Sequence, residues 1–312
     1  MAHPPVQDGL FERRVSFPDP DARSRLASLV GLDEHKSRLA KMLGLLVNPT
    51  GLEAWARRYH GSTASLLRPV LRRPPLVVLA GDVGSGKTEL AETIGDQVAR
   101  QEDIEITLLP LSLSARGQGR VGEMTQLIAQ AFDYTAAEAG RLKSASGKAR
   151  GAVILLIDEA DALAQSREAA QMHHEDRAGV NALIRGINRL TADRLPAAVI
   201  MCTNRLSALD PAVRRRAADV LTFERPNDAQ RRHALTQVFG ELNWPASVID
   251  GLVAATGPSA TAKYGFTFSD IMQRLAPTIV LDAYPDRAID PRRAIELVRS
   301  MTPTPPFQDR GA

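Results

Sequence analysis

Apolar runs alternate with amphipathic segments through the central part of the chain. Five runs have the length and composition of buried strands, and they lie at residues 75–80, 104–111, 151–158, 197–204 and 219–223. Helical spacing of apolar residues separates the runs, most clearly over residues 88–100, 123–133 and 179–190. Strands without polar positions that alternate with helices are typical of a parallel sheet covered on both faces. We therefore predict a doubly wound α/β fold with a five-stranded parallel sheet.

The flanking parts of the chain have other patterns. Ahead of the first strand, Asp33 is a suitable N-cap for a helix with Leu39 and Leu43 on its apolar face. After Pro226 no strand-like run occurs, and four helical segments follow at residues 228–240, 247–256, 268–284 and 291–301. We predict an N-terminal tail or linker (1–28), a large α/β domain (29–225), a small helical lid domain (226–303) and a mobile tail (304–312).

Composition limits the class of protein. A chain of 312 residues with 44% hydrophobic and 24% charged residues can bury a sizeable core. The net charge of +3 is too small to indicate a nucleic-acid-binding protein. The single cysteine, Cys202, excludes a disulfide framework and a cysteine-rich zinc site. Because no apolar run approaches a membrane span and the N-terminus lacks the core of a signal peptide, we expect a cytoplasmic protein.

A phosphate-binding motif, GDVGSGKT, begins at Gly81, directly after the first predicted strand and before a helix. In such a loop the backbone N–H groups turn toward a phosphate at a helix N-terminus. Lys87 would reach the β and γ oxygens, and the hydroxyl of Thr88 would bind Mg²⁺. We predict that ATP and Mg²⁺ are held by Asp82, Val83, Gly84, Ser85, Gly86, Lys87, Thr88 and Glu89.

Two carboxylates follow the third predicted strand, in the sequence VILLIDEAD. Asp158 lies where the strand ends and can hold Mg²⁺ through water, and Glu159 is suited to polarising the attacking water. Carboxylates beside an apolar run are costly without a cation. The predicted reaction is ATP hydrolysis. The letters DEAD also mark a class of helicases, but those enzymes need a second domain of nucleotide-binding type, whereas the remainder of this chain has a helical pattern.

With both motifs in place, the chain resembles the AAA+ ATPases from LVGLDEHK at residue 29 to the last helices. The resemblance implies that Val30, Gly31 and Leu32 line the adenine pocket. It implies that Asn204 is the sensor that orients the lytic water. An arginine after LDPA, at Arg215 or Arg216, would contact the γ-phosphate of the adjacent subunit, which requires a homo-oligomeric ring. The choice among Arg214, Arg215 and Arg216, and a second-sensor role for Arg274, stay open.

Within that family, VNALIRGINRL, RRRAADVLTFERP and IMQRLAPTIVLDAY most resemble the pachytene-checkpoint ATPases, which unfold and reset HORMA-domain proteins. Bacterial relatives act beside cyclic-oligonucleotide anti-phage synthases. The resemblance implies a ring, expected to be a hexamer, that engages the terminus of a HORMA-type partner in its central pore. It places Arg120, Val121 and Gly122 in the substrate pore loop, with Arg120 where relatives have an aromatic residue. Residues 165–179 would form a second pore loop, in which His173 and His174 are ordinary polar residues.

Two other functions are compatible with an AAA+ module. One is an ATPase that acts on nucleic acid, such as a transposition or loader ATPase. That function would call for a lysine-bearing pore or an added DNA-binding domain, and neither is evident in the sequence. The other is a nucleotide-gated scaffold that barely hydrolyses ATP. The presence of Glu159, Asn204 and the arginines argues against it, because those groups serve the chemical step.

Overall fold

The computed structural model describes residues 9–61, 64–113, 122–144, 148–161, 173–259 and 263–307. The chain divides into two compact units. The first, which we call the sheet unit, comprises Met1–Ala27, Glu34–Ala80 and Thr88–Thr222. The second, which we call the helical unit, comprises Ser28–Asp33, Gly81–Lys87 and Phe223–Ala312. The predicted boundary between residues 225 and 226 stays a prediction.

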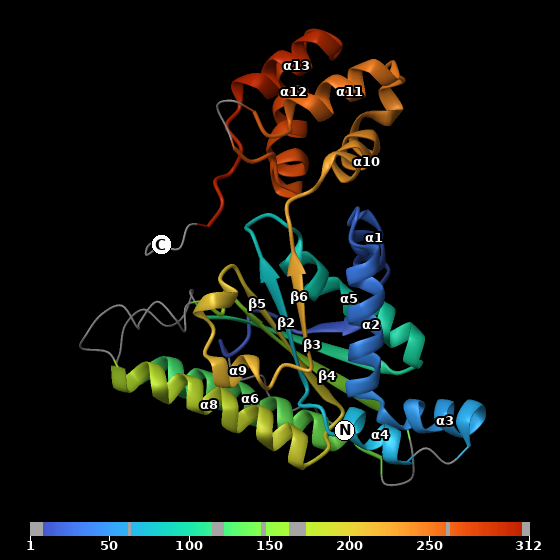
Figure 1. Cartoon of the computed structure of the whole chain (residues 1–312), viewed down its shortest axis with the longest axis vertical. Coiled ribbons are helices and arrows are strands. Elements are labelled where there is room, and N and C mark those ends of the chain that lie inside the picture. Colours follow the sequence, from blue (N-terminus) through green and yellow to red (C-terminus); the bar gives the residue numbers. More distant parts are fainter. Residues whose placement is uncertain are drawn as a thin grey trace. The chain divides into compact units, whose positions relative to one another are not determined.

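A six-stranded sheet forms the centre of the sheet unit, with the strand order β1-β3-β4-β5-β2-β6 (Figure 1). The strands are β1 (Val15–Phe17), β2 (Leu76–Gly81), β3 (Glu105–Ser112), β4 (Gly151–Asp158), β5 (Ala197–Thr203) and β6 (Asp219–Phe223). Strands β3, β4, β5 and β2 pair in parallel, whereas β1 is antiparallel to β3. The predicted α/β fold is confirmed, and all five predicted strands are present.

The additional strand β1 corrects two predictions, that the sheet has five strands and that residues 1–28 form a tail or linker. Residues 1–28 were assigned to a tail or linker, but β1 and α1 (Pro20–Ser28) form there, and Phe17 is buried against Gly95. The N–H of Asp19 also donates a hydrogen bond of 2.7 Å to the carboxylate of Asp96. A strand of three residues is too short to produce an alternating pattern, so the sequence could not reveal it.

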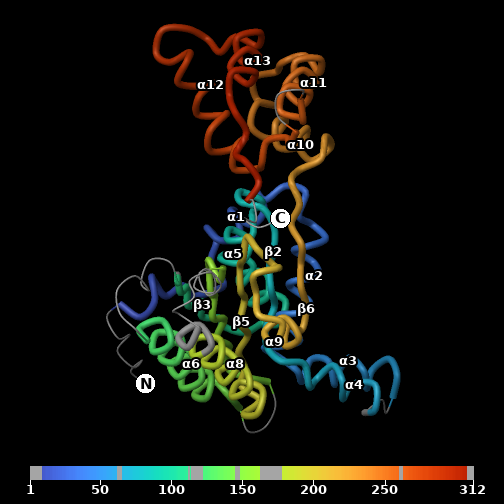
Figure 2. The backbone as a smooth tube through the Cα atoms, turned by 60° about the vertical axis from the view of Figure 1, so that its left-hand side comes forward, coloured from blue at the N-terminus to red at the C-terminus, as the bar shows by residue number. Residues whose placement is uncertain are grey.

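Helices cover both faces of the sheet. The helices of the sheet unit after α1 are α2 (Asp33–Val47), α3 (Pro49–His60), α4 (Ala64–Leu71), α5 (Lys87–Glu102), α6 (Glu123–Leu142), α8 (His173–Ala192) and the short α9 (Pro211–Arg214). Of these, α3 and α4 pack on each other and lie away from the sheet (Figure 2). Helices α6 and α8 run side by side (Figures 1 and 2). The ring of Phe132 packs directly on Gly186. Successive residues of β4 point to opposite faces of the sheet, and residues on both faces are buried, including Ile154 and Leu155. This burial on two faces explains the continuous apolar runs of the sequence.

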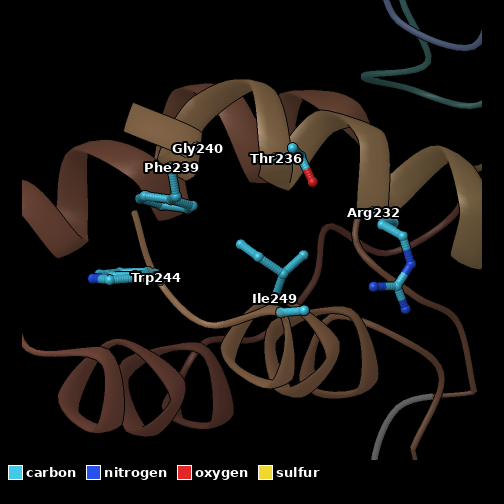
Figure 3. A pocket seen from close by; sticks show the side chains of 7 residues that line it. Arg232, Thr236, Phe239, Gly240, Trp244 and Ile249 are labelled. Carbon is cyan, nitrogen blue, oxygen red and sulfur yellow. The ribbon is translucent and has the colours of Figure 1, made fainter. Parts of the chain in front are cut away.

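The helical unit contains α10 (Asp228–Phe239), α11 (Ala246–Ala255), a π-helical turn η4 (Asp270–Leu275), α12 (Ala276–Ala283) and α13 (Pro291–Ser300). The four predicted helical segments are therefore present, and the third consists of η4 and α12. The hydrophobic core of the helical unit includes Leu235, Leu252, Phe266 and Leu275. A surface pocket lies between α10 and α11, where the rings of Phe239 and Trp244 stack at 5.4 Å (Figure 3).

The end of the described chain is also held in place, although residues 304–312 were predicted to be a mobile tail. The N–H and the hydroxyl of Thr304 donate hydrogen bonds to the buried carboxylate of Asp270, at 3.0 and 2.6 Å. Asp270 lies 34 positions earlier in the chain, so no local pattern could indicate this contact. Among the helices of the described ranges, none combines the length and the hydropathy of a membrane-spanning segment.

Candidate nucleotide site

The phosphate loop lies in the helical unit and follows β2 directly. Its glycines are required by the backbone, since Gly84 and Gly86 have φ values of 72° and 94°. A Cβ atom on Gly81 would come within 2.1 Å of the carbonyl oxygen of Phe223. The ammonium of Lys87 donates a hydrogen bond of 2.7 Å to the carbonyl oxygen of Asp82, as does the hydroxyl of Ser85. The loop thus closes on itself around the lysine that was predicted to bind phosphate.

The segment predicted to line the adenine pocket belongs to the same compact unit. Gly31 has a φ of 69°, and its carbonyl accepts a hydrogen bond of 2.9 Å from the side-chain amide of Gln230. A Cβ atom on Gly86 would touch the side chain of Leu32 at 3.1 Å. The structure therefore brings Val30, Gly31 and Leu32 together with the phosphate loop and the start of α10.

The predicted catalytic carboxylates lie in the sheet unit, where β4 ends. Asp158 is the last residue of β4 and is half-buried, and the exposed Glu159 follows it. The N–H of Glu159 donates a hydrogen bond of 2.8 Å to the Asp158 carboxylate. Glu159 has a φ of 53°, a left-handed conformation that costs a non-glycine residue about 1 kcal/mol or more. The fold maintains this strain at the residue predicted to polarise water.

Asp161 is a further residue of this site, and it was not among the predicted site residues. Its carboxylate is 6% exposed and accepts hydrogen bonds from the N–H of Asn204 and the hydroxyl of Thr203, at 3.2 and 3.3 Å. These bonds join the segment after β4 to the end of β5 and fix the backbone of the predicted sensor, Asn204. The available signal was the fourth letter of DEAD, an acid next to a buried strand.

Two further predicted residues lie in the first turn of α5, in the sheet unit. Thr88 is exposed, with its hydroxyl at the helix N-terminus. Glu89, which was predicted to contact the nucleotide, accepts a hydrogen bond of 2.8 Å from the guanidinium of Arg25. This hydrogen bond raises the pKa of Arg25 above its ordinary value. The structure therefore assigns the Glu89 carboxylate a partner in α1.

Comparison with known proteins identifies the family. The AAA model, described as ATPase family associated with various cellular activities, matches residues 77–225. CD-NTase-associated protein 6 of Escherichia coli (strain MS 115-1) is 65% identical over 306 residues, which cover 98% of each chain. The chain belongs to the AAA family of ATPases. The family resemblance that the sequence indicated is confirmed, and with it nucleotide binding and ATPase activity.

Solved structures support the same assignment of this AAA ATPase. A chain in the structure of an E. coli MS115-1 HORMA:CdnC:Trip13 complex is 64% identical with a TM-score of 0.87, covering 96% of this chain and 97% of that one. A Rhizobiales Trip13 structure is 58% identical with a TM-score of 0.74, covering 95% and 100%. C. elegans PCH-2, at 18% identity and a TM-score of 0.65 over 92% of this chain and 73% of that one, shares the fold.

The arginine cluster of this AAA ATPase begins with the last residue of α9, whose N-cap Asp210 accepts a hydrogen bond of 2.7 Å from the N–H of Ala212. Arg216 is half-buried, and its guanidinium donates to the Asn188 side chain and to the Ala212 carbonyl, at 3.3 and 2.9 Å. Arg214 and Arg215 are exposed. Within the part of the chain that the structure describes, the guanidinium of Arg215 has no hydrogen-bond partner.

The predicted pore loops fall largely outside the described residues. Arg120 and Val121 lie there, as do residues 165–172, and the side chains of His173 and His174 are not described either. Gly122 is described and forms the N-cap of α6 with a φ of 82°. In the described ranges, no three His, Cys, Asp or Glu side chains gather as a metal site.

Proposed function

We propose that this AAA ATPase uses ATP hydrolysis to remodel a HORMA-domain protein in a CD-NTase anti-phage system. The observation that carries the proposal is the 65% identity to CD-NTase-associated protein 6 across 98% of both chains. The similarity to a chain in the HORMA:CdnC:Trip13 complex supports the choice of partner, because the likeness extends over 96% of this chain. The large domain (29–225) would hold the hydrolytic residues and the small domain (226–303) would act as a lid.

The chemistry would be divided among few residues. Lys87 and the N–H groups of its loop would bind the phosphates, Glu159 would accept a proton from the attacking water, and Asn204 would orient that water. The hydroxyl of Thr88 and the carboxylate of Asp158 are hard oxygen donors, which suit Mg²⁺. When bound, the ion would neutralise charge that develops on the phosphate oxygens.

A ring, proposed to be a hexamer, would complete each site. Arg215 or Arg216 would contact the nucleotide of the neighbouring copy, and the exposed guanidinium of Arg215 makes it the stronger candidate. A permanently charged, planar group in this position contributes about 10³ to 10⁵ in rate in related phosphoryl-transfer enzymes. Arg120, Val121 and Gly122 would contact the polypeptide in the pore.

The test is a substrate trap. The Glu159→Gln variant is mixed with the HORMA-domain protein encoded with its CD-NTase, with or without ATP, and complex formation is measured by size-exclusion chromatography. We expect a stable complex that depends on ATP, and none with a control that also carries Lys87→Ala. Loss of the ATP dependence would contradict the proposal. Salt-dependent binding to random-sequence DNA at physiological ionic strength, in place of the protein complex, would favour the nucleic-acid alternative.

A further inference from the structure

The phosphate loop contains an acid as its second residue. A carboxylate in a loop that receives a polyphosphate repels the ligand unless another group neutralises it. Both oxygens of Asp82 are occupied. Oδ2 accepts a hydrogen bond of 2.6 Å from Nε of Arg225, and Oδ1 accepts from the N–H groups of Val83 and Phe307, at 2.9 and 3.1 Å. The Asp82 and Arg225 side chains are only 16% and 14% exposed, so solvent screens the pair little.

Arg225 uses each of its three nitrogens for a different partner. Beyond the bond to Asp82, its Nη1 donates to the Gly265 carbonyl at 2.8 Å, and its Nη2 donates to the Thr304 carbonyl at 2.7 Å. The guanidinium also lies over the ring of Tyr264, 4.8 Å from its centroid. A planar group with several donors can make all these contacts at once, whereas the ammonium of a lysine cannot.

The segment from Thr302 to Phe307 connects this pair to the rest of the helical unit. Its Thr304 donates two hydrogen bonds to the buried Asp270, and its Thr302 carbonyl accepts one of 3.2 Å from Arg274. The residue before Asp270, Ser269, donates its N–H to the carbonyl of Gly84 at 3.2 Å. The phosphate loop is therefore held at Asp82 by the C-terminal segment and Arg225, and at Gly84 by Ser269, the N-cap of η4.

We propose that Arg225 and the segment Thr302–Phe307 form a positioning element for the nucleotide. Arg225 neutralises Asp82, and the hydrogen bonds from Arg225 and Phe307 hold the carboxylate away from the space in which phosphate binds. The element touches no reacting atom, so its loss weakens nucleotide affinity more than it slows the chemical step. The inference goes beyond the proposed remodelling function, because it depends only on nucleotide binding.

A double-mutant cycle that neutralises each of the two charges tests the role of Arg225. The affinity of the full-length protein for a fluorescent ADP analogue is measured for Arg225→Gln, Asp82→Asn and the double variant. Arg225→Gln weakens binding roughly tenfold, the size expected for the loss of one charged hydrogen bond. The double variant recovers most of that loss, because the unpaired carboxylate is gone. Arg225→Lys, which keeps the charge, recovers part of it, and Arg232→Gln on α10 is the matched surface control.

Two results of this cycle would overturn the proposal. One is wild-type affinity in Arg225→Gln. The other is a double variant that binds as weakly as Arg225→Gln, since that would give the arginine a purely structural role. The melting temperature of each variant is measured alongside the affinity, so that loss of folding is recognised directly.

A second pair of variants leaves the ion pair intact and tests the C-terminal segment. Phe307→Pro removes the N–H that donates to Asp82, whereas Phe307→Ala removes the ring and keeps the N–H. Phe307→Pro is expected to bind the ADP analogue roughly fivefold more weakly than Phe307→Ala. In ATP hydrolysis, the KM of Phe307→Pro should change more than its kcat. Equal affinities in the two variants would show that this segment does not position the loop.

Discussion

The N–H of Asn204 donates a hydrogen bond to the carboxylate of Asp161 across 3.2 Å, and so ties the end of β5 to the segment that follows β4. Thr203 adds its hydroxyl to the same carboxylate. In Asp161→Ala both donors lose their acceptor in a buried place, which costs about 1–3 kcal/mol. We expect kcat to fall roughly tenfold to a hundredfold, because Asn204 loses its fixed position, while nucleotide affinity changes little.

Steady-state kinetics and nucleotide titration check this prediction. Asp161→Asn keeps one carbonyl acceptor and should be affected less than Asp161→Ala. Asp133→Ala removes an exposed acid of the same unit and serves as the control. An unchanged kcat in Asp161→Ala would contradict the prediction that Asp161 holds Asn204 in its catalytic position.

The left-handed backbone of Glu159 predicts a conflict between stability and activity. Glu159→Gln and Glu159→Gly should both reduce turnover by orders of magnitude while keeping ATP binding. Glycine in an exposed helix position costs about 1 kcal/mol, as expected for the control Glu53→Gly in α3. At residue 159 the relief of strain offsets that cost, so Glu159→Gly should unfold at no lower denaturant concentration than Glu159→Gln. A clear loss of stability in Glu159→Gly would contradict this.

Arg215 is exposed and Arg216 is half-buried, so substitution of these two arginines should reduce ATP turnover by different amounts. Arg215→Ala with Arg216→Ala should abolish turnover with little change in nucleotide affinity, and Arg215→Ala alone should account for most of the loss. Mixed rings provide the decisive measurement. A subunit with Arg215→Ala keeps its own Glu159, and a Glu159→Gln neighbour supplies the intact Arg215, so mixing two inactive variants should restore part of the turnover. No recovery would mean that the arginine acts within its own subunit. Arg214→Ala is the control.

Low pH should destabilise the helical unit, because the buried carboxylate of Asp270 becomes protonated. Burial raises the pKa of this carboxyl, but hydrogen bonds from the Thr304 hydroxyl, the Thr267 and Thr304 N–H groups and Arg274 outweigh burial, and the pKa lies below its ordinary value. A lowered pKa means that the carboxylate stabilises the fold above about pH 4 and loses this contribution as pH falls through its folded value.

Thermal unfolding between pH 7 and pH 3 measures this effect. At pH 7, Asp270→Asn should have a lower melting temperature than the wild type, and its free energy of unfolding should be lower by about 1–3 kcal/mol. This difference in stability between the two proteins should narrow below about pH 4. The exposed Asp286→Asn provides the control. A difference that stays constant over the whole pH range would contradict the role given to the Asp270 charge.

Much of this molecule could be predicted because its signals are local. A buried parallel strand such as β4 can be recognised from an apolar run of six to eight residues. The phosphate loop can be recognised from the spacing of its glycines within one short segment of the sequence. The missed features depend on distant partners. Asp161 acquires its role from Asn204, 43 positions away, and Asp82 from Arg225, 143 positions away. The helices α3 and α4 were also missed. Their exposed Trp55, Tyr59 and Leu66 blur the division between an apolar and a polar face.

The short strand β1 has a practical consequence for work with fragments. Val15, Ser16 and Phe17 pair with Leu108, Thr107 and Ile106, and so cover the outer edge of the sheet. A truncated protein that starts at residue 29, where the family resemblance begins, would leave this edge of β3 uncovered. An uncovered apolar edge recruits strands from other molecules. Such a shortened version would precipitate or form β-linked aggregates, whereas one that keeps residues 9–28 would stay dispersed.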